Sequence, residues 1–306
     1  EAHAALRSLD YGAAAGNDGV TRRWLEYFCE KTTMAQMIKI QMANDVHPDH
    51  ADWICGGRAT GMSKPKDANG IRPITVSSLR ARWTAKTALK KHANRVTKHL
   101  GHYQTAVNTR SGAETSVMLS RLWLERNPTH AVLLSDIANG YGSVQRKNVG
   151  DRIRKHLEQL STTWAFLYGD RINKIILTLP DGTQQVEDMH DGLLQGCCFA
   201  AAAFTLTGVD SRTEINGWYD PPNHDINGAA APTTTIQQKT APREAIFSEY
   251  IDDQNFLGTP QHVLKMFIRS VQMDAAQGKH PCRKKIVVAS PTRETLLDPA
   301  WTALEE

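Results

Sequence analysis

The segment 245–258 constrains the fold more than any other part of the sequence, because two apolar runs flank a short acidic turn. The pattern predicts a strand over residues 245–250, a turn at Asp252 and Asp253, and a returning strand over 255–258. Adjacent carboxylates repel each other, so such a turn is unfavourable unless a cation or solvent compensates the charge. Alone, the motif is weak evidence of function, since Asp-Asp pairs are common in surface turns.

A third acid follows another apolar run. Residues 131–134 form a short continuous apolar stretch, which predicts a buried strand ending at Asp136. Three carboxylates at strand ends of one sheet could hold two Mg²⁺ ions and support in-line phosphoryl transfer. The spacing permits this interpretation for Asp136, Asp252 and Asp253, and does not by itself establish it.

Helix and strand patterns alternate irregularly along the chain, which predicts an α+β fold with a mainly antiparallel sheet covered by helices on one side. We expect helices over residues 3–10, 22–43 after a Thr21 cap, 79–100, 115–125, 147–168, 197–209 and 260–277. We expect further strands over 57–64 and 71–77, with Asn69-Gly70 in their turn, in a hairpin over 173–187 with a turn at 180–183, and over 285–289. Residues 221–242 are rich in Asn, Thr, Gln and Pro, which indicates an exposed loop or insertion.

The charge is unevenly distributed, although the formal net charge is only +4. Residues 57–111 contain twelve Lys or Arg and one Asp, so this basic segment carries +11 and the rest of the chain −7. Such a segment favours a polyanionic partner, although a charge run alone is also typical of a solvated helix face. No apolar run approaches the roughly 18–20 residues of a membrane span, so no membrane partner is expected. The five scattered cysteines favour a reduced, intracellular setting over a disulfide framework or zinc site.

Seven short motifs follow one another along nearly the whole chain. They are Ala14-Ala-Gly-Asn-Asp-Gly19, Lys64-Pro with Arg72-Pro-Ile74, Gln104 with Gly112-Ala-Glu114, Asp136 to Arg146, Gly192-Leu-Leu-Gln-Gly196 with Phe204, Tyr250-Ile-Asp-Asp253, and Gly278 with Lys285. In this order they resemble the motifs of reverse transcriptases of the non-LTR retrotransposon type. Each motif alone is weak, whereas their order and spacing together form a specific pattern.

The resemblance implies a polymerase right hand with fingers and palm, an antiparallel palm sheet backed by helices, and no thumb. It assigns residues 1–128 to the fingers, 129–146 to the first part of the palm, 147–190 to a connecting segment and 191–306 to the second part of the palm. The implied reaction is RNA-templated DNA synthesis, an RNA-directed DNA polymerase activity. The implied partners are an RNA template, a DNA primer, dNTPs and further domains of a larger polyprotein.

The resemblance also implies roles for individual residues. Asp136 and Asp252 would be ligands of two Mg²⁺ ions, with Mn²⁺ as a possible substitute, and Asp253 would be a supporting acid or ligand. The implied nucleotide contacts are Arg72 and Lys64 at the triphosphate, Tyr141 closing the sugar pocket against a 2′-hydroxyl, Gln195 and Gly196 under the nascent base pair, and Lys285 near the leaving pyrophosphate. The implied template contacts are Lys66, Arg80, Arg82 and Lys86.

The sequence departs from the family pattern in several places. Cys197-Cys198 replaces the usual Asp-Pro, and Gly140, Gly142 and Cys282 stand where other residues are usual. None of these changes removes an implied metal ligand. They leave a second possibility open, a catalytically inactive, domesticated module that binds RNA or protein. An RNA-templated RNA polymerase is a weaker alternative, since such enzymes usually carry Gly-Asp-Asp and lack the aromatic residue at the position of Tyr141.

Overall fold

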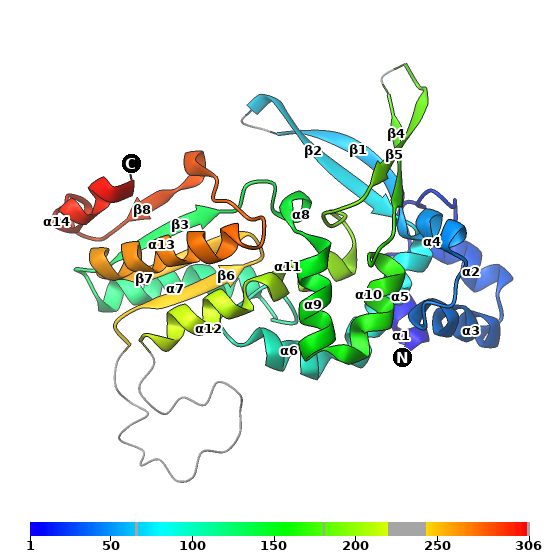
Figure 1. Ribbon diagram of the computed structural model, residues 1–306, viewed down its shortest axis with the longest axis horizontal. Coiled ribbons are helices and arrows are strands. Elements are labelled where there is room, and N and C mark those ends of the chain that lie inside the picture. Colours follow the sequence, from blue (N-terminus) through cyan, green and yellow to red (C-terminus); the bar gives the residue numbers. More distant parts are fainter. Residues whose placement is uncertain (65–66, 180, 220–242, 305–306) are drawn as a thin grey trace, which may run out of the picture. The chain divides into compact units, whose positions relative to one another are not determined.

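The computed structural model describes residues 1–304 apart from 65–66, 180 and 220–242, so the loop expected at 221–242 lies outside the described residues. The chain divides into two compact units, each described separately below (Figure 1). Unit 1 comprises Glu1–Val96 and Tyr141–Phe204, and unit 2 comprises Thr97–Gly140 and Thr205–Glu306. The chain passes between the units three times, within helices α6 (Ala93–Leu100), α8 (Gly140–Ser143) and α11 (Cys198–Thr207).

Unit 2 is built on a fully antiparallel sheet with the strand order β6–β7–β3–β8. The strands are β3 (Ala131–Asp136), β6 (Ile246–Tyr250), β7 (Asp253–Gly258) and β8 (Val287–Ala289). The apolar β3 lies inside the sheet, between β7 and β8. The predicted strands are therefore confirmed, except that residues 283–285 form a 3₁₀ turn before β8.

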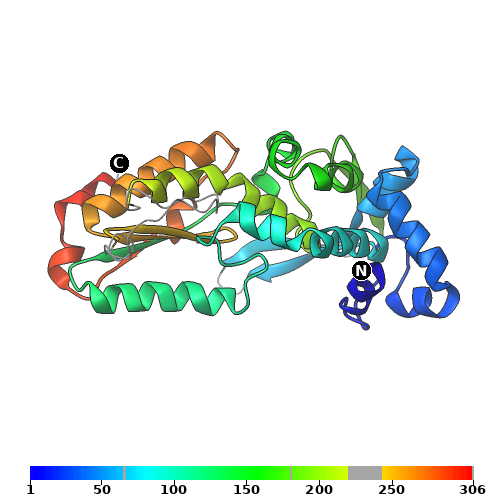
Figure 2. The same cartoon turned by 90° about the horizontal axis from the view of Figure 1, so that it is seen from below.

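Helices cover both faces of this sheet, whereas the sequence led us to expect one (Figure 2). Adjacent residues of a strand point to opposite faces. Asn255 donates to Ser116 of α7 (Gly112–Arg126), and Gln254 donates to Asp274 of α13 (Pro260–Ala275). The helices α7 and α13 therefore lie on opposite faces, and α12 (Val209–Gly217) packs against β6 and α13.

The core of unit 2 lies on the α13 face of the sheet. The rings of Phe247 and Phe256 stack with centroids 4.6 Å apart, and Phe267 packs edge-on against Phe256. These rings are buried with Met266 and other residues of α12 and α13. Helix α7 buries only Gly112 and Ser116 fully, so its packing against the sheet is less extensive. Helix α7 contacts this sheet, and residues 112–126 belong to unit 2.

Unit 1 contains a second sheet with the order β2–β1–β4–β5. The strands are β1 (Gly57–Lys64), β2 (Asp67–Ser77), β4 (Asn173–Thr178) and β5 (Gln184–Met189), and β4 runs parallel to β1. The turn predicted at Asn69-Gly70 is wrong, because β2 already begins at Asp67, which pairs with Lys64. The turn between β4 and β5 is confirmed, with Gly182 at φ 85°.

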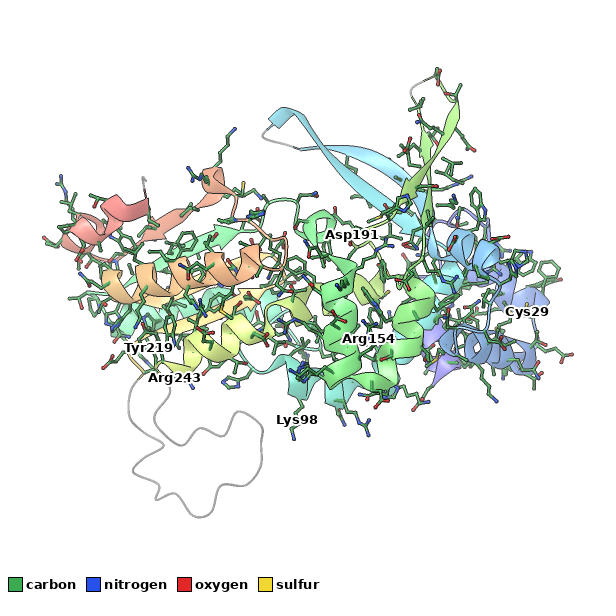
Figure 3. All side chains as sticks on the ribbon, viewed as in Figure 1. Cys29, Lys98, Arg154, Asp191, Tyr219 and Arg243 are labelled. Atoms are coloured by element: carbon green, nitrogen blue, oxygen red, sulfur yellow. The ribbon has the colours of Figure 1, made fainter. Side chains whose placement is uncertain are left out.

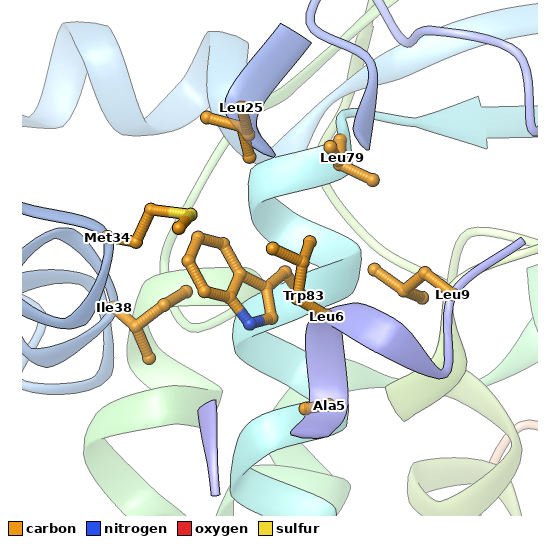
Figure 4. Close-up of a cluster of buried hydrophobic side chains, with 8 residues drawn as sticks. All are labelled: Ala5, Leu6, Leu9, Leu25, Met34, Ile38, Leu79 and Trp83. Carbon is orange, nitrogen blue, oxygen red and sulfur yellow. The ribbon is translucent and has the colours of Figure 1, made fainter. Parts of the chain in front are cut away.

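Helices that pack around Trp83 form the core of unit 1 (Figure 4). Trp83 belongs to α5 (Leu79–Lys91), and its indole N–H donates to the carbonyl of Ala2 over 2.6 Å. The surrounding apolar side chains come from α1 (Ala2–Arg7), α2 (Arg22–Phe28) and α3 (Lys31–Met42). The basic segment thus contributes a core aromatic residue.

Several predicted helices are interrupted. Thr21 caps α2 as expected, accepting from the Trp24 N–H, but Cys29 is extended and separates α2 from α3. His92 separates α5 from α6, which divides the predicted helix over 79–100. The predicted helix over 147–168 is α9 (Arg146–His156), a 3₁₀ turn and α10 (Ser161–Leu167). Helix α4 (Pro48–Cys55) was not predicted, although Pro48 at its first position is a helix-start signal.

The remaining short elements are α8 (Gly140–Ser143), α14 (Arg293–Leu296) and a 3₁₀ segment over Pro299–Leu304. Throughout the described ranges, every helix is too short or too polar to span a bilayer.

Candidate functional site

Asp136 and Asp253 face each other on neighbouring strands of unit 2. Asp136 is the last residue of β3 and pairs with Asp253, the first residue of β7. Directly opposite residues of an antiparallel pair point to the same face, with Cβ atoms about 4.5–5.5 Å apart. The antiparallel ladder therefore brings together two carboxylates that are distant in the sequence.

Asp252 lies in a strained turn between β6 and β7. Tyr250 pairs with Asp253, so Ile251 and Asp252 alone form the loop between β6 and β7. Ile251 has φ 57°, a conformation that is unfavourable for a β-branched residue and that glycine usually supplies in such turns. The carbonyl of Asp252 accepts from the N–H of Ile137, directly after β3. This hydrogen bond ties the acidic turn to the strand end that carries Asp136.

The three acids affect one another electrostatically. Burial raises the pKa of Asp252, and the charges of Asp136 and Asp253 raise it further. Burial also raises the pKa of Asp253, to which Asp136 adds, while Lys285 acts in the opposite direction on both. The raised pKa values mean that the fully ionised cluster is unfavourable in this environment and would be stabilised by a cation.

Lys285 supplies one positive charge at this cluster. Its ammonium group lies 2.5 Å from Oδ2 of Asp136, and this hydrogen bond raises the pKa of Lys285. The preceding segment is hydrogen-bonded to the end of β3, since Cys282 N–H donates to the Asp136 carbonyl over 2.7 Å. Lys285, expected near the leaving pyrophosphate, thus contacts an acid that the resemblance assigns to metal binding.

The acids fit a Mg²⁺ site in chemistry and location, but their side chains are not arranged as ligands of one ion. Carboxylate oxygens are the ligands that Mg²⁺ prefers. Within the described ranges, no three His, Cys, Asp or Glu side chains form a group that could hold a metal ion. An ion bound by all three acids would have to replace Lys285 at Asp136.

A groove of about 480 Å³ adjoins the acids. Small and apolar residues of α7 and β3 line it, including Ser116, Val117 and Leu134, and Asp136, Asp253 and Lys285 also belong to its lining. Leu134 remains 38% exposed in the middle of the sheet. Unit 2 therefore has open space beside its acidic cluster.

Other expected contact residues lie in unit 1. The Gln195 carbonyl accepts from Thr75 N–H of β2 over 3.0 Å. Gly196 has φ 116°, and a Cβ at this position would lie 2.6 Å from the Thr75 carbonyl oxygen. Only glycine therefore fits at this position, because the backbone of β2 lies directly against it.

Tyr141 packs against Phe204 with ring centroids 5.6 Å apart, and its carbonyl accepts from Leu193 N–H over 2.8 Å. Arg72 and Lys64 are placed by their backbones in β2 and β1, paired with Met62 and Asp67, and their side chains lie outside the described part of the structure. Lys66 lies outside the described residues entirely.

Three side chains that were expected to contact the template bond to other groups within unit 1. Arg80 forms an ion pair with Asp18, with its Nε 3.1 Å from the carboxylate. Arg82 donates to the carbonyl of Ala14 over 2.8 Å, and Lys86 donates to that of Ser8 over 2.7 Å. This face of α5 therefore binds the N-terminal segment. The sequence could not reveal this, because the Asp18 carboxylate and the carbonyls of Ala14 and Ser8 lie more than 60 residues away along the chain.

Arg146 is the last residue of the motif that begins at Asp136, and no functional role was expected for it. Arg146 is 4% exposed, and its guanidinium donates to the carbonyls of Gly192 and Arg171 and to the Asn173 side chain. The backbone N–H of Arg146 donates to the side chain of Asp191, which lies near the start of α9 (Figure 3). Arg146 therefore anchors the start of the 192–196 segment.

Comparison with known proteins bears on the fold. No protein-family model and no curated protein matches the sequence. Among solved structures, apo telomerase from Candida tropicalis is similar with a TM-score of 0.51 at 10% identity, covering 86% of this chain and 50% of that chain. Telomerase from the same organism in complex with a TWJ fragment of telomeric RNA has a TM-score of 0.51 at 10% identity, covering 79% of this chain and 42% of that chain.

Telomerase is a reverse-transcriptase-related polymerase, so the chain has a reverse-transcriptase-like α+β fold. At this identity, the likeness concerns the fold alone. The chain spans about half the length of the telomerase chains that it matches.

Proposed function

We propose that this chain forms the fingers and palm of an RNA-directed DNA polymerase of the non-LTR retrotransposon type. The observation that carries the proposal is the acidic cluster of Asp136, Asp252 and Asp253, located at the adjoining strand ends of an antiparallel sheet. A reverse-transcriptase-like fold supports it independently. In this proposal the sheet of unit 2 is the palm, and the β1–β2 hairpin belongs to the fingers.

The proposed cofactor is Mg²⁺, bound by the three acids. When bound, it would supply Lewis-acid activation of the primer hydroxyl and compensate charge on the triphosphate. The raised pKa values of Asp252 and Asp253 support a cation at this location, because a cation relieves the repulsion that raises them.

The proposed roles of the other residues are binding and orientation. Arg72 and Lys64 bind the triphosphate of the incoming dNTP, because the planar guanidinium fork suits phosphate oxygens. Tyr141 excludes a 2′-hydroxyl, and its packing against Phe204 limits the movement of its ring. Lys285 neutralises Asp136, and its ammonium group would be available to the pyrophosphate if a cation took its place at this acid.

A primer-extension assay tests the proposal. The 306-residue chain, an RNA template, a DNA primer, Mg²⁺ and dNTPs should give nucleotide addition. Asp252→Asn should reduce addition to background while template affinity changes by less than about threefold, or about 0.7 kcal/mol. Asp45→Asn, which makes the same change at an exposed carboxylate of unit 1, should behave as wild type. Equal activity in wild type and Asp252→Asn would sink the metal-ligand assignment.

A second candidate function is an inactive module that binds RNA or protein. The Lys285–Asp136 ion pair favours it, because the lysine ammonium group already compensates the charge of Asp136. Cys197-Cys198, in place of the family's usual residues, also favours it. This candidate predicts RNA binding without Mg²⁺-dependent addition, both in the wild type and in Lys285→Met.

A further inference from the structure

Two buried ion pairs lie within unit 2. Arg212 of α12 pairs with Glu249 of β6, and the Lys279 ammonium lies 2.5 Å from Asp274 of α13. All four side chains are at most 3% exposed. Burying such charges costs several kcal/mol per ion, and apolar residues of similar volume are often at least as stable. Stability alone therefore gives no clear reason for these pairs.

Gln254 connects the two pairs. Its side-chain amide donates to Asp274 over 2.8 Å and to Glu249 over 3.2 Å. Glu249 and Gln254 are register partners that flank the Tyr250–Asp253 turn on either side. Because strand residues alternate between faces, both lie on the face opposite to Asp253. The connected ion pairs thus hold the two strand ends from which the acidic turn projects.

Lys279 also begins the segment that leads to Lys285. Directly after it, the His280 carbonyl accepts from Ala138 N–H over 2.8 Å, and Cys282 N–H donates to the Asp136 carbonyl over 2.7 Å. Pro281 and Ile137 form an isolated antiparallel bridge. The segment 279–285 therefore runs alongside the end of β3, with the buried Lys279 as its anchor in the core.

We propose that the network Arg212–Glu249–Gln254–Asp274–Lys279 is a positioning device for the acidic cluster. It holds the turn with Asp252 and Asp253 on one side, and the segment with Lys285 on the other, in a fixed relation to Asp136. Directional hydrogen bonds between charged groups define one arrangement, whereas apolar contacts tolerate sliding. Gln254 and Lys279 are positioning residues, and their catalytic consequence rests on the proposed function.

The principal test is the variant Asp274→Asn/Lys279→Met, which replaces a charged pair by neutral side chains of similar size. Removing both charges together leaves no uncompensated buried ion, so the variant should fold with a Tm within a few degrees of wild type. Native-state hydrogen exchange of the Ala138 and Cys282 amides should become at least tenfold faster. Amides of the β3–β7 ladder should keep their wild-type rates.

Primer extension provides a second readout. In the variant, kcat should fall at least tenfold with KM for dNTP within about twofold, because the acids are displaced and the proposed nucleotide contacts in unit 1 are unchanged. The control is Glu214→Gln/Arg269→Met, which removes a partly exposed ion pair of 2.7 Å between α12 and α13 that is not part of the network. It should change neither exchange at the two amides nor kcat.

The outcomes separate the two proposals. Wild-type exchange at Ala138 and Cys282, or equal acceleration throughout the sheet, would overturn the positioning role. If the double variant does not fold, Gln254→Met removes the connection alone and should accelerate exchange at the same two amides. A wild-type chain without polymerase activity contradicts the proposed function, while the exchange experiment still decides the positioning role.

Discussion

The ammonium group of Lys285 lies 2.5 Å from the carboxylate of Asp136, although 149 residues separate them in the sequence. The protein thus supplies its own counter-charge to one of its three clustered acids. The other two, Asp252 and Asp253, remain in an environment that raises their pKa. This asymmetry makes the cluster sensitive to cations and to pH.

Lys285→Met should tighten Mg²⁺ binding by up to about fivefold, because the ammonium no longer competes for Asp136. This corresponds to the 0.2–1 kcal/mol typical of a solvent-exposed ion pair. Isothermal titration with Mg²⁺ measures the change. Lys284→Met removes an equal charge from the neighbouring exposed lysine and should have a smaller effect. Unchanged or weaker Mg²⁺ binding in Lys285→Met contradicts the competition.

Asp252→Asn should stabilise the metal-free protein at neutral pH. The folded state raises the pKa of Asp252, so its ionisation opposes folding once the pH exceeds the value of the unfolded chain. The stability difference between variant and wild type should therefore be near zero around pH 4 and grow as the pH rises through the folded pKa. Urea unfolding at several pH values measures it. A stability difference that becomes smaller as the pH rises toward 7 would contradict this prediction.

Gly196→Ala should destabilise the protein by about 2 kcal/mol or more, because the new Cβ meets the Thr75 carbonyl and φ 116° disfavours side chains. Gly182→Ala separates the two causes, since Gly182 has φ 85° but open space around it. That control should cost only about 1 kcal/mol. Chemical unfolding of both variants measures the two losses of stability. Equal losses would contradict the predicted clash between the new Cβ and the Thr75 carbonyl.

Arg146→Met should cost about 3 kcal/mol, because two buried acceptors and one half-buried acceptor lose a charged donor. Arg146→Lys should recover only part of this loss, since an ammonium cannot reproduce the planar fork. Lys147→Met, at the adjacent exposed position, should be nearly neutral. Urea midpoints decide the order, and a neutral Arg146→Met would mean that this residue does not anchor Gly192.

Lys86→Met should lower stability by about 1 kcal/mol, because Lys86 binds the Ser8 carbonyl and so attaches the N-terminal segment to α5. It should leave the salt dependence of RNA binding unchanged, since the hydrogen bond to Ser8 holds the Lys86 ammonium against the N-terminal segment. Filter binding across salt concentrations measures the slope of log Kd against log salt. A slope reduced by about 1 would identify Lys86 as a phosphate contact. Lys91→Met controls for the lost charge.

The sequence alone was sufficient for the local elements that surround the acids. Apolar runs on either side of Asp252, and before Asp136, predicted strands that the structure contains. Thr21 was correctly identified as a helix cap. These features depend on burial periodicity and short-range backbone preference, which neighbouring residues determine. The order of the motifs also indicated the reverse-transcriptase-like fold.

Tertiary structure decided what the charged side chains contact. The +11 segment suggested a template surface, yet Arg82 and Lys86 bind backbone carbonyls of the N-terminal segment. Lys285 faces Asp136, and Gln254 joins two buried ion pairs. A long side chain bonds to whichever partner packing brings within about 3 Å, and that partner can lie anywhere in the chain. Residue type and spacing therefore determined the strands and the acidic turn around the site, while the folded core alone determined which charged side chains find a partner of opposite charge within the protein.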